Sequence, residues 1–227
     1  MSPPVARPYP RFIADSAQEG LPYGRWAERL LEPFASACEP FAEEAGAPLD
    51  PDSVEWYPER GWGGRVYVPV TGRGVEAEEG DEEGAPVEYF GHVSFVRPED
   101  GEASELRATA EFTDVVAEDN PGWRIDLNDD VLGPWRTDGG RGGDVTLVWG
   151  EPLVRGAVAV TAELDGETVD QAPIEDDRFT LVAVDAVKGF GDDLYLEVRL
   201  WDRRVNELAR ESLYDEPESA GPDSSAG

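Results

Sequence analysis

The sequence predicts a mainly β protein, an antiparallel β-sandwich or strongly curved sheet that follows one N-terminal helical segment. Two observations support this fold class. An apolar stripe with helical spacing ends at about residue 45, and after about residue 64 the apolar period becomes two residues. Turn-forming Gly, Pro and Asp residues separate these short alternating segments, and strand–helix–strand alternation does not occur. An α+β arrangement is the alternative.

The helical segment is expected over residues 23–44. Pro33 and Pro40 lie within it, so each proline either opens a new helical turn or kinks the helix. Cys38 lies on the apolar stripe without a histidine nearby in sequence, so we expect a small core residue rather than a nucleophile. The stripe consists of Trp26, Leu30, Phe34, Ala37, Cys38, Phe41 and Ala45.

The strands are expected where apolar and polar residues alternate or where an apolar run is short. The clearest example is 105–113, whose alternation predicts one buried face of an antiparallel hairpin. Asp165-Gly166 suits a two-residue hairpin turn. Residues 205–214 fit either a helix or the return strand of a hairpin. The expected strands are 65–70, 88–97, 105–113, 145–149, 154–164, 167–172, 178–187 and 194–201.

The expected organisation follows shifts in composition. It comprises an extended arm (1–22), a helix plus β unit (23–136), a Gly-rich linker or loop (137–144), a β unit (145–214) and a disordered acidic tail (215–227). The arm is rich in proline, and the tail has no residue to bury. The two β units form either one domain or two. Residues 72–86 are expected to form an acidic loop.

The charge of the chain excludes several function classes. With 50 Asp and Glu against 19 Lys and Arg, the formal net charge is −31. Such a chain is repelled by nucleic acid and by anionic membranes, so we expect neither as a partner. The acids are spread evenly and Lys188 is the only lysine, which indicates halophilic adaptation or a GC-rich genome. The sequence lacks an apolar stretch long enough to span a membrane and a secretory signal, so a cytoplasmic location is expected.

Catalytic constellations are absent from the sequence. His92 is the only histidine, and its position on a predicted strand favours a hydrogen-bonded residue of the sheet. One histidine and one cysteine exclude the usual zinc sites, and phosphate-binding glycine motifs are missing. Paired carboxylates for glycoside hydrolysis are conceivable, but nothing in the sequence selects a pair. We therefore predict no catalytic residues.

Calcium is the one cofactor that the sequence leaves open. Asp126, Asn128 and Asp130 offer oxygen ligands at positions 1, 3 and 5 of a calcium loop. Position 6 is Val131 rather than glycine and position 12 is Thr137 rather than glutamate, so the segment is not an EF-hand.

Four tryptophans are the candidate ligand-binding residues. Trp56, Trp62, Trp123 and Trp135 fall in predicted connections that are rich in Gly, Pro and acidic residues. Aromatic side chains on such loops stack on sugars or form hot spots for protein partners. The alternative is that each loop folds its tryptophan over the core.

From these features we predict a non-enzymatic binding or assembly module with an unknown protein or carbohydrate partner. A carboxylate-dependent hydrolase acting on carbohydrate is the first alternative. The second is an acidic inhibitor that imitates nucleic acid and binds a basic protein, which would require rows of acids on one face.

Overall fold

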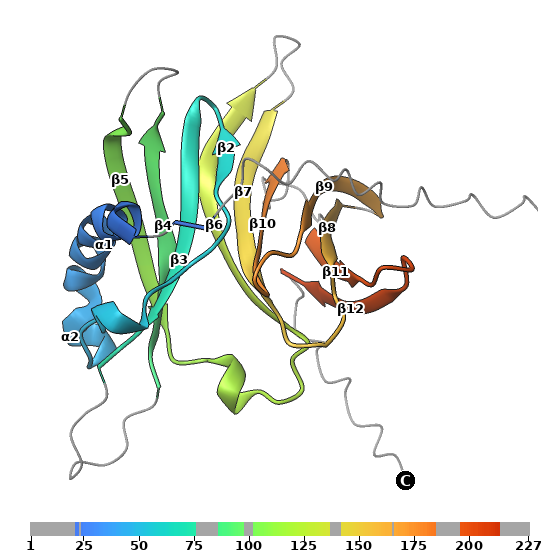
Figure 1. The fold of residues 1–227 in the computed structure, drawn as a ribbon, viewed down its shortest axis with the longest axis horizontal. Coiled ribbons are helices and arrows are strands. Elements are labelled where there is room, and N and C mark those ends of the chain that lie inside the picture. The colour runs from blue at the N-terminus through green and yellow to red at the C-terminus, as the bar shows by residue number, and fades with distance from the viewer. Residues whose placement is uncertain are drawn as a thin grey trace, which may run out of the picture.

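The computed structural model describes residues 21–22, 24–75, 86–97, 102–136, 142–164, 166–184 and 196–213. Figure 1 shows four layers, with a helix on one side of three antiparallel sheets that follow one another across the molecule. The predicted fold class, mainly β with an N-terminal helix, is confirmed. Nearly all of the predicted arm and the whole acidic tail lie outside the described residues. In the part that is described, no helix is long and apolar enough to cross a membrane.

The helical segment forms where the apolar stripe predicts it. Helix α1 (Gly24–Cys38) contains Pro33 and continues through a 3₁₀ turn, η1 (Glu39–Phe41), into the short α2 (Ala42–Ala45). Pro40 is the second residue of the 3₁₀ turn, and Gly46 ends α2 at a positive φ of 74°. Cys38 is buried, and burial raises the pKa of its thiol to about 12, so the thiolate is not formed at neutral pH.

The first sheet lies directly against α1. Its strand order is β1-β3-β4-β5, and β2 pairs with β3. Leu30 and Phe34 of α1 pack against Val68 and Val93 of the sheet to form the first of three hydrophobic cores. The 3₁₀ turn η2 (Pro51–Ser53) precedes the sheet. The strands are β1 (Glu55–Trp56), β2 (Arg60–Trp62), β3 (Arg65–Arg73), β4 (Glu88–Val96) and β5 (Ser104–Thr113).

The second sheet is the middle layer and has the order β10-β7-β6. Its strands are β6 (Ile125–Arg136), β7 (Gly142–Pro152) and β10 (Phe179–Val184), and the 3₁₀ turn η3 (Ala117–Asp119) precedes β6. Trp149 faces the first sheet and Val148 faces the third, so both faces of β7 are buried. The segment predicted to be a linker joins two strands of one sheet, because Arg136 pairs with Gly142, while 137–141 lie outside the described residues.

The third sheet closes the molecule on the side opposite to α1 and has the order β12-β11-β8-β9. The predicted strand 154–164 starts only at Ala159, because Gly156 adopts a φ of +90° that interrupts the extended chain. The alternatives for 205–214 are settled in favour of a return strand. The strands are β8 (Ala159–Leu164), β9 (Glu167–Pro173), β11 (Leu196–Trp201) and β12 (Glu207–Ser212).

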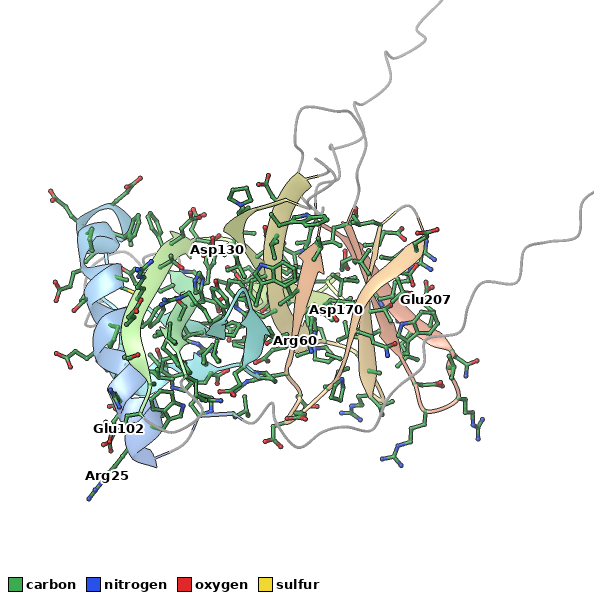
Figure 2. The ribbon with its side chains drawn as sticks, turned by 90° about the horizontal axis from the view of Figure 1, so that it is seen from above. Arg25, Arg60, Glu102, Asp130, Asp170 and Glu207 are labelled. Atoms are coloured by element: carbon green, nitrogen blue, oxygen red, sulfur yellow. The ribbon has the colours of Figure 1, made fainter. Side chains whose placement is uncertain are left out.

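An ion pair also connects the first and third sheets. Arg60 of β2 lies 2.5 Å from Asp170 of β9, and the same carboxylate accepts a 2.7 Å hydrogen bond from the amide of Val182 on β10 (Figure 2). One carboxylate therefore joins strands of all three sheets at a place where both ionic side chains are largely buried.

Candidate functional site

Polar side chains face each other across the boundary between the first and second sheets. On β4, Glu88 and His92 point toward β6, and on β6, Asp126 and Asp130 point back. Glu88 faces Asp126, and His92 faces Asp130. The two contacts are four residues apart on each strand. Two polar clusters therefore lie along one boundary.

The first cluster is a triangle of His92, Thr109 and Asp130. His92 Nδ1 lies 2.9 Å from both Thr109 Oγ1 and Asp130 Oδ2, and the Thr109 hydroxyl donates to Asp130 over 2.8 Å. Since the ionised carboxylate only accepts, the network places a proton on Nδ1. Burial alone would raise the pKa of Asp130, but the bonds and charge of His92 and the Thr109 hydroxyl hold it below its usual value.

The second cluster consists of the carboxyl groups of Glu88, Asp126 and Glu151. Burial, reinforced by the negative charge of Asp126, raises the pKa of Glu88 from 4.5 to about 7. Burial and the charge of Glu151 also raise the pKa of Asp126. A carboxyl group with a pKa near 7 exchanges its proton at neutral pH, which is a property of catalytic acids and bases.

Arg178 and Tyr57 complete the second cluster on the side of Glu151. Arg178 Nε donates to Glu151 over 3.0 Å, another nitrogen of its guanidinium lies 2.6 Å from Glu55, and the guanidinium carbon stands 5.6 Å from the centre of the Tyr57 ring. The Tyr57 hydroxyl donates to Glu151 over 3.4 Å. Burial and the charge of Glu151 raise the pKa of Tyr57 well above its usual value. Glu151 is thus compensated by Arg178.

The three proposed calcium ligands do not converge. Asp126, Asn128 and Asp130 alternate along one face of β6, where successive same-face residues are separated by about 7 Å. Asp130 is already bonded to His92 and Thr109. Among the described residues, no group of three or more His, Cys, Asp or Glu side chains is placed to hold a metal ion. The structure thus gives the calcium hypothesis no support.

The four candidate tryptophans do not form one surface. Trp56 is 8% exposed and packs against Phe34 of α1, with ring centroids 6.5 Å apart. Trp62 and Trp135 are partly buried and pack against the core between the first and second sheets. Trp123 is the most exposed of the four, at 37%. Three of the four predicted connections are wrong, because Trp56 lies in β1, Trp62 in β2 and Trp135 in β6.

A hollow of about 460 Å³ opens beside the third sheet. Two loops form it, residues 153–158 between β7 and β8 and residues 202–206 between β11 and β12. Arg155 comes from the first loop, and Arg203 and Arg204 come from the second. The apolar side chains of Val158 and Leu208 and the exposed Gly156 complete the lining, together with Asp202. Its volume falls within the range of small-molecule sites.

The arginines of the hollow are exceptions in this molecule. Most arginines whose side chains are described pair with a carboxylate: Arg29, Arg60, Arg65, Arg73, Arg97, Arg107, Arg178, Arg199 and Arg210. Arg155, Arg203 and Arg204 form no ion pair with any described residue, and Arg25 on α1 shares this property. Arg25 lies at the other end of the molecule, beyond the first sheet (Figure 2).

The carboxylate of Asp202, the one acidic residue that lines the hollow, accepts hydrogen bonds from its own loop. Asp202 Oδ1 accepts hydrogen bonds of 2.8 Å from the amides of both Arg204 and Asn206, and Oδ2 accepts one of 2.9 Å from the Asn206 side chain. The Asn206 and Arg204 contacts hold the pKa of Asp202 below its usual value. The lining residues thus carry three positive charges and one negative charge. The hollow is therefore net positive in a strongly negative protein.

The sequence contained only a weak signal for this hollow. Arg203 and Arg204 are adjacent cations in a chain where cations are scarce, and Arg155 stands beside a glycine. Their meeting depends on the pairing of β8 with β11, in which Ala159 lies opposite Trp201. That pairing brings the two loops together and was not readable from the sequence.

The fold and the hollow together define a layered antiparallel β protein with a small cationic site at its C-terminal sheet. No protein-family model, curated protein or solved structure matches the chain.

Proposed function

We propose that the chain is a non-enzymatic binding module that holds an anionic ligand in the hollow of Arg155, Arg203 and Arg204. The observation that carries this proposal is that three arginines from two loops line one hollow and form no ion pair with any described carboxylate. In a chain with 50 acidic residues, a guanidinium finds a carboxylate easily, and most of the others do. Guanidinium groups are also the side chains best suited to bind phosphate and carboxylate oxygens.

The net charge of −31 does not oppose such a site at short range. Charges on the far faces of the molecule are screened within about 10 Å at 0.1 M salt, so an anion at the hollow responds mainly to the arginines that surround it. Asp202 stays ionised, but its carboxylate oxygens already accept hydrogen bonds from its own loop, and the three arginines outnumber it. The tryptophan surface predicted from the sequence supports binding less well, since Trp56 belongs to the core.

Calorimetric titration with pyrophosphate and with phenyl phosphate tests the proposal. We expect at least one of these anions to bind the wild type, and the Arg203→Gln/Arg204→Gln variant to bind it about tenfold or more weakly. Arg25→Gln is the matched control, because Arg25 is equally unpaired but lies on α1. If neither anion binds, or if both variants weaken binding equally, the proposal is wrong.

A second candidate function, acid–base hydrolysis of a carbohydrate, is favoured by the pKa of about 7 of Glu88. Hydrolysis of a glycosidic bond needs one protonated and one ionised carboxyl group, and Asp126 stands beside Glu88. The test is release of nitrophenol from a panel of aryl glycosides. Turnover that Glu88→Gln abolishes while the fold persists would support this function, and the lack of turnover on every substrate would contradict it.

We also propose that the chain works in a salt-rich cytoplasm. The even spread of acidic residues and the near absence of lysine support this setting. Cys38 is buried with a thiol of raised pKa, which is compatible with a compartment where thiols stay reduced.

A further inference from the structure

We propose that the hollow selects an organic phosphate monoester, a phosphate that carries an apolar group, over an inorganic anion. This inference rests on the proposed binding function and specifies its ligand class. Two features of the hollow carry it, namely how the arginines are distributed and what lies between them.

The arginines stand on two different loops. Arg155 belongs to the β7–β8 loop, whereas Arg203 and Arg204 belong to the β11–β12 loop. A group that contacts both loops must offer more than one acceptor oxygen. A phosphate monoester carries a charge near −2 at neutral pH and three terminal oxygens, which matches more than one guanidinium. A single carboxylate has two oxygens and one charge, and would leave part of this cationic set uncompensated.

The space between the loops is larger than the anion requires and is partly apolar. Val158 and Leu208 line it, and Leu208 also packs against the core between the second and third sheets. Gly156 adds no side chain, and the position where its Cβ would lie has no neighbouring atom within 4 Å. An inorganic anion would leave these apolar residues facing water. A small apolar group attached to the phosphate would cover them.

The backbone of the β11–β12 loop is braced by hydrogen bonds within the loop. The Asp202 carboxylate accepts hydrogen bonds from the backbone amides of Arg204 and Asn206. The backbone amide of Asp202 donates to the Asn206 carbonyl, and its carbonyl accepts a hydrogen bond from the Val205 amide. Val205 adopts a φ of +62°, which is uncommon for a β-branched residue and persists only where the surrounding bonds impose it. Because the loop is fixed, the backbone that carries Arg203 and Arg204 loses little freedom when a ligand binds.

The inference is tested by calorimetric titration of the full chain with inorganic phosphate, methyl phosphate, phenyl phosphate and phenol under one salt condition. We expect phenyl phosphate to bind about tenfold or more tightly than inorganic phosphate, with methyl phosphate between them and phenol undetected. The double variant Arg203→Gln/Arg204→Gln should bind phenyl phosphate with about tenfold lower affinity than the wild type. The Arg25→Gln control should change the affinity by less than about twofold.

The possible failures are distinguishable. Equal, arginine-dependent affinities for inorganic and phenyl phosphate would overturn the selection of an ester and leave anion binding in place. If none of these anions nor pyrophosphate binds in a manner that depends on Arg203 and Arg204, both the ligand class and the binding function are wrong. Phenol binding as tight as phenyl phosphate would also overturn the inference, because the site would then be apolar rather than cationic.

Discussion

Glu88 should make the protein less stable as the pH rises through the neutral range. Its pKa is about 7 in the folded protein against 4.5 for the ordinary group, so the folded state binds more protons than the unfolded chain between these values. Stability contributed by the protonated form is complete below pH 4.5 and is lost as the pH passes 7. Each pKa unit corresponds to about 1.4 kcal/mol, so the loss is up to roughly 3 kcal/mol.

Glu88→Gln isolates this effect because glutamine does not titrate. We expect the free energy of unfolding of the variant, minus that of the wild type, to increase by up to roughly 3 kcal/mol from about pH 4 to about pH 8. Urea denaturation followed by circular dichroism at fixed salt measures the difference at each pH. Glu111→Gln, an exposed carboxylate of β5 in the same sheet, is the control. A difference between Glu88→Gln and wild type that stays constant with pH would refute the reasoning.

Three further changes test the packing and the charge of the fold. Gly91→Ala should lower the free energy of unfolding by about 3 kcal/mol or more, because the new Cβ would lie 2.1 Å from the Thr109 carbonyl oxygen. Gly122→Ala is the control, since its Cβ would meet open space, and urea denaturation should show a change of less than about 0.5 kcal/mol. Asp130→Asn should cost about 2 kcal/mol near neutral pH by removing the charged partner of His92, and the cost should shrink below about pH 4 as the wild-type carboxyl protonates. The melting temperature should rise from low salt to about 3 M KCl, and an unchanged value would show that self-repulsion of the −31 charge does not limit stability.

The spacing of apolar residues predicted those helices and strands that have one buried face and one face exposed to solvent. The helical stripe that includes Leu30 and Phe34 became the buried face of α1. The alternation over 105–113 became β5, the outer strand of the first sheet, which α1 covers on one side. In both elements the contrast between apolar and polar faces is strong, and that contrast is the signal that period analysis detects.

Strand β6 was not predicted, because its polar face packs against another sheet and is not exposed to solvent. Ile125 and Leu127 alternate with Asp126 and Asn128, which is the pattern of a strand. The acids and the following Gly-Pro pair nevertheless suggested a connection. In the structure the polar side of β6 faces the first sheet and carries Asp130, which bonds to His92 and Thr109. A single sequence cannot reveal that a carboxylate will have a partner on another sheet.

The positions of the candidate site residues were hard to predict for a related reason. Trp56 was predicted in a connection, with folding over the core as the alternative, and two residues of strand pairing to β3 bring it under α1. Arg155 and Arg203 are about fifty positions apart in the chain, and only the register of β8 against β11 makes them neighbours. Sites built from loops of different strands depend on register, which short segments do not encode individually.

The arginines of the hollow differ from those elsewhere in the structure, most of which form ion pairs with carboxylates. Arg60 and Arg178 each join separate strands through carboxylates, and Arg199, which is 2% exposed, is buried among acidic groups of the third sheet. Arg155, Arg203 and Arg204 make no ion pair of this kind with any residue that the structure describes, and all three line one hollow. Asp202 is the one acidic residue of the lining, and it leaves an excess of two positive charges. An anion that binds there compensates this charge, and it should raise the melting temperature by an amount that grows with the logarithm of its concentration once that concentration exceeds the dissociation constant.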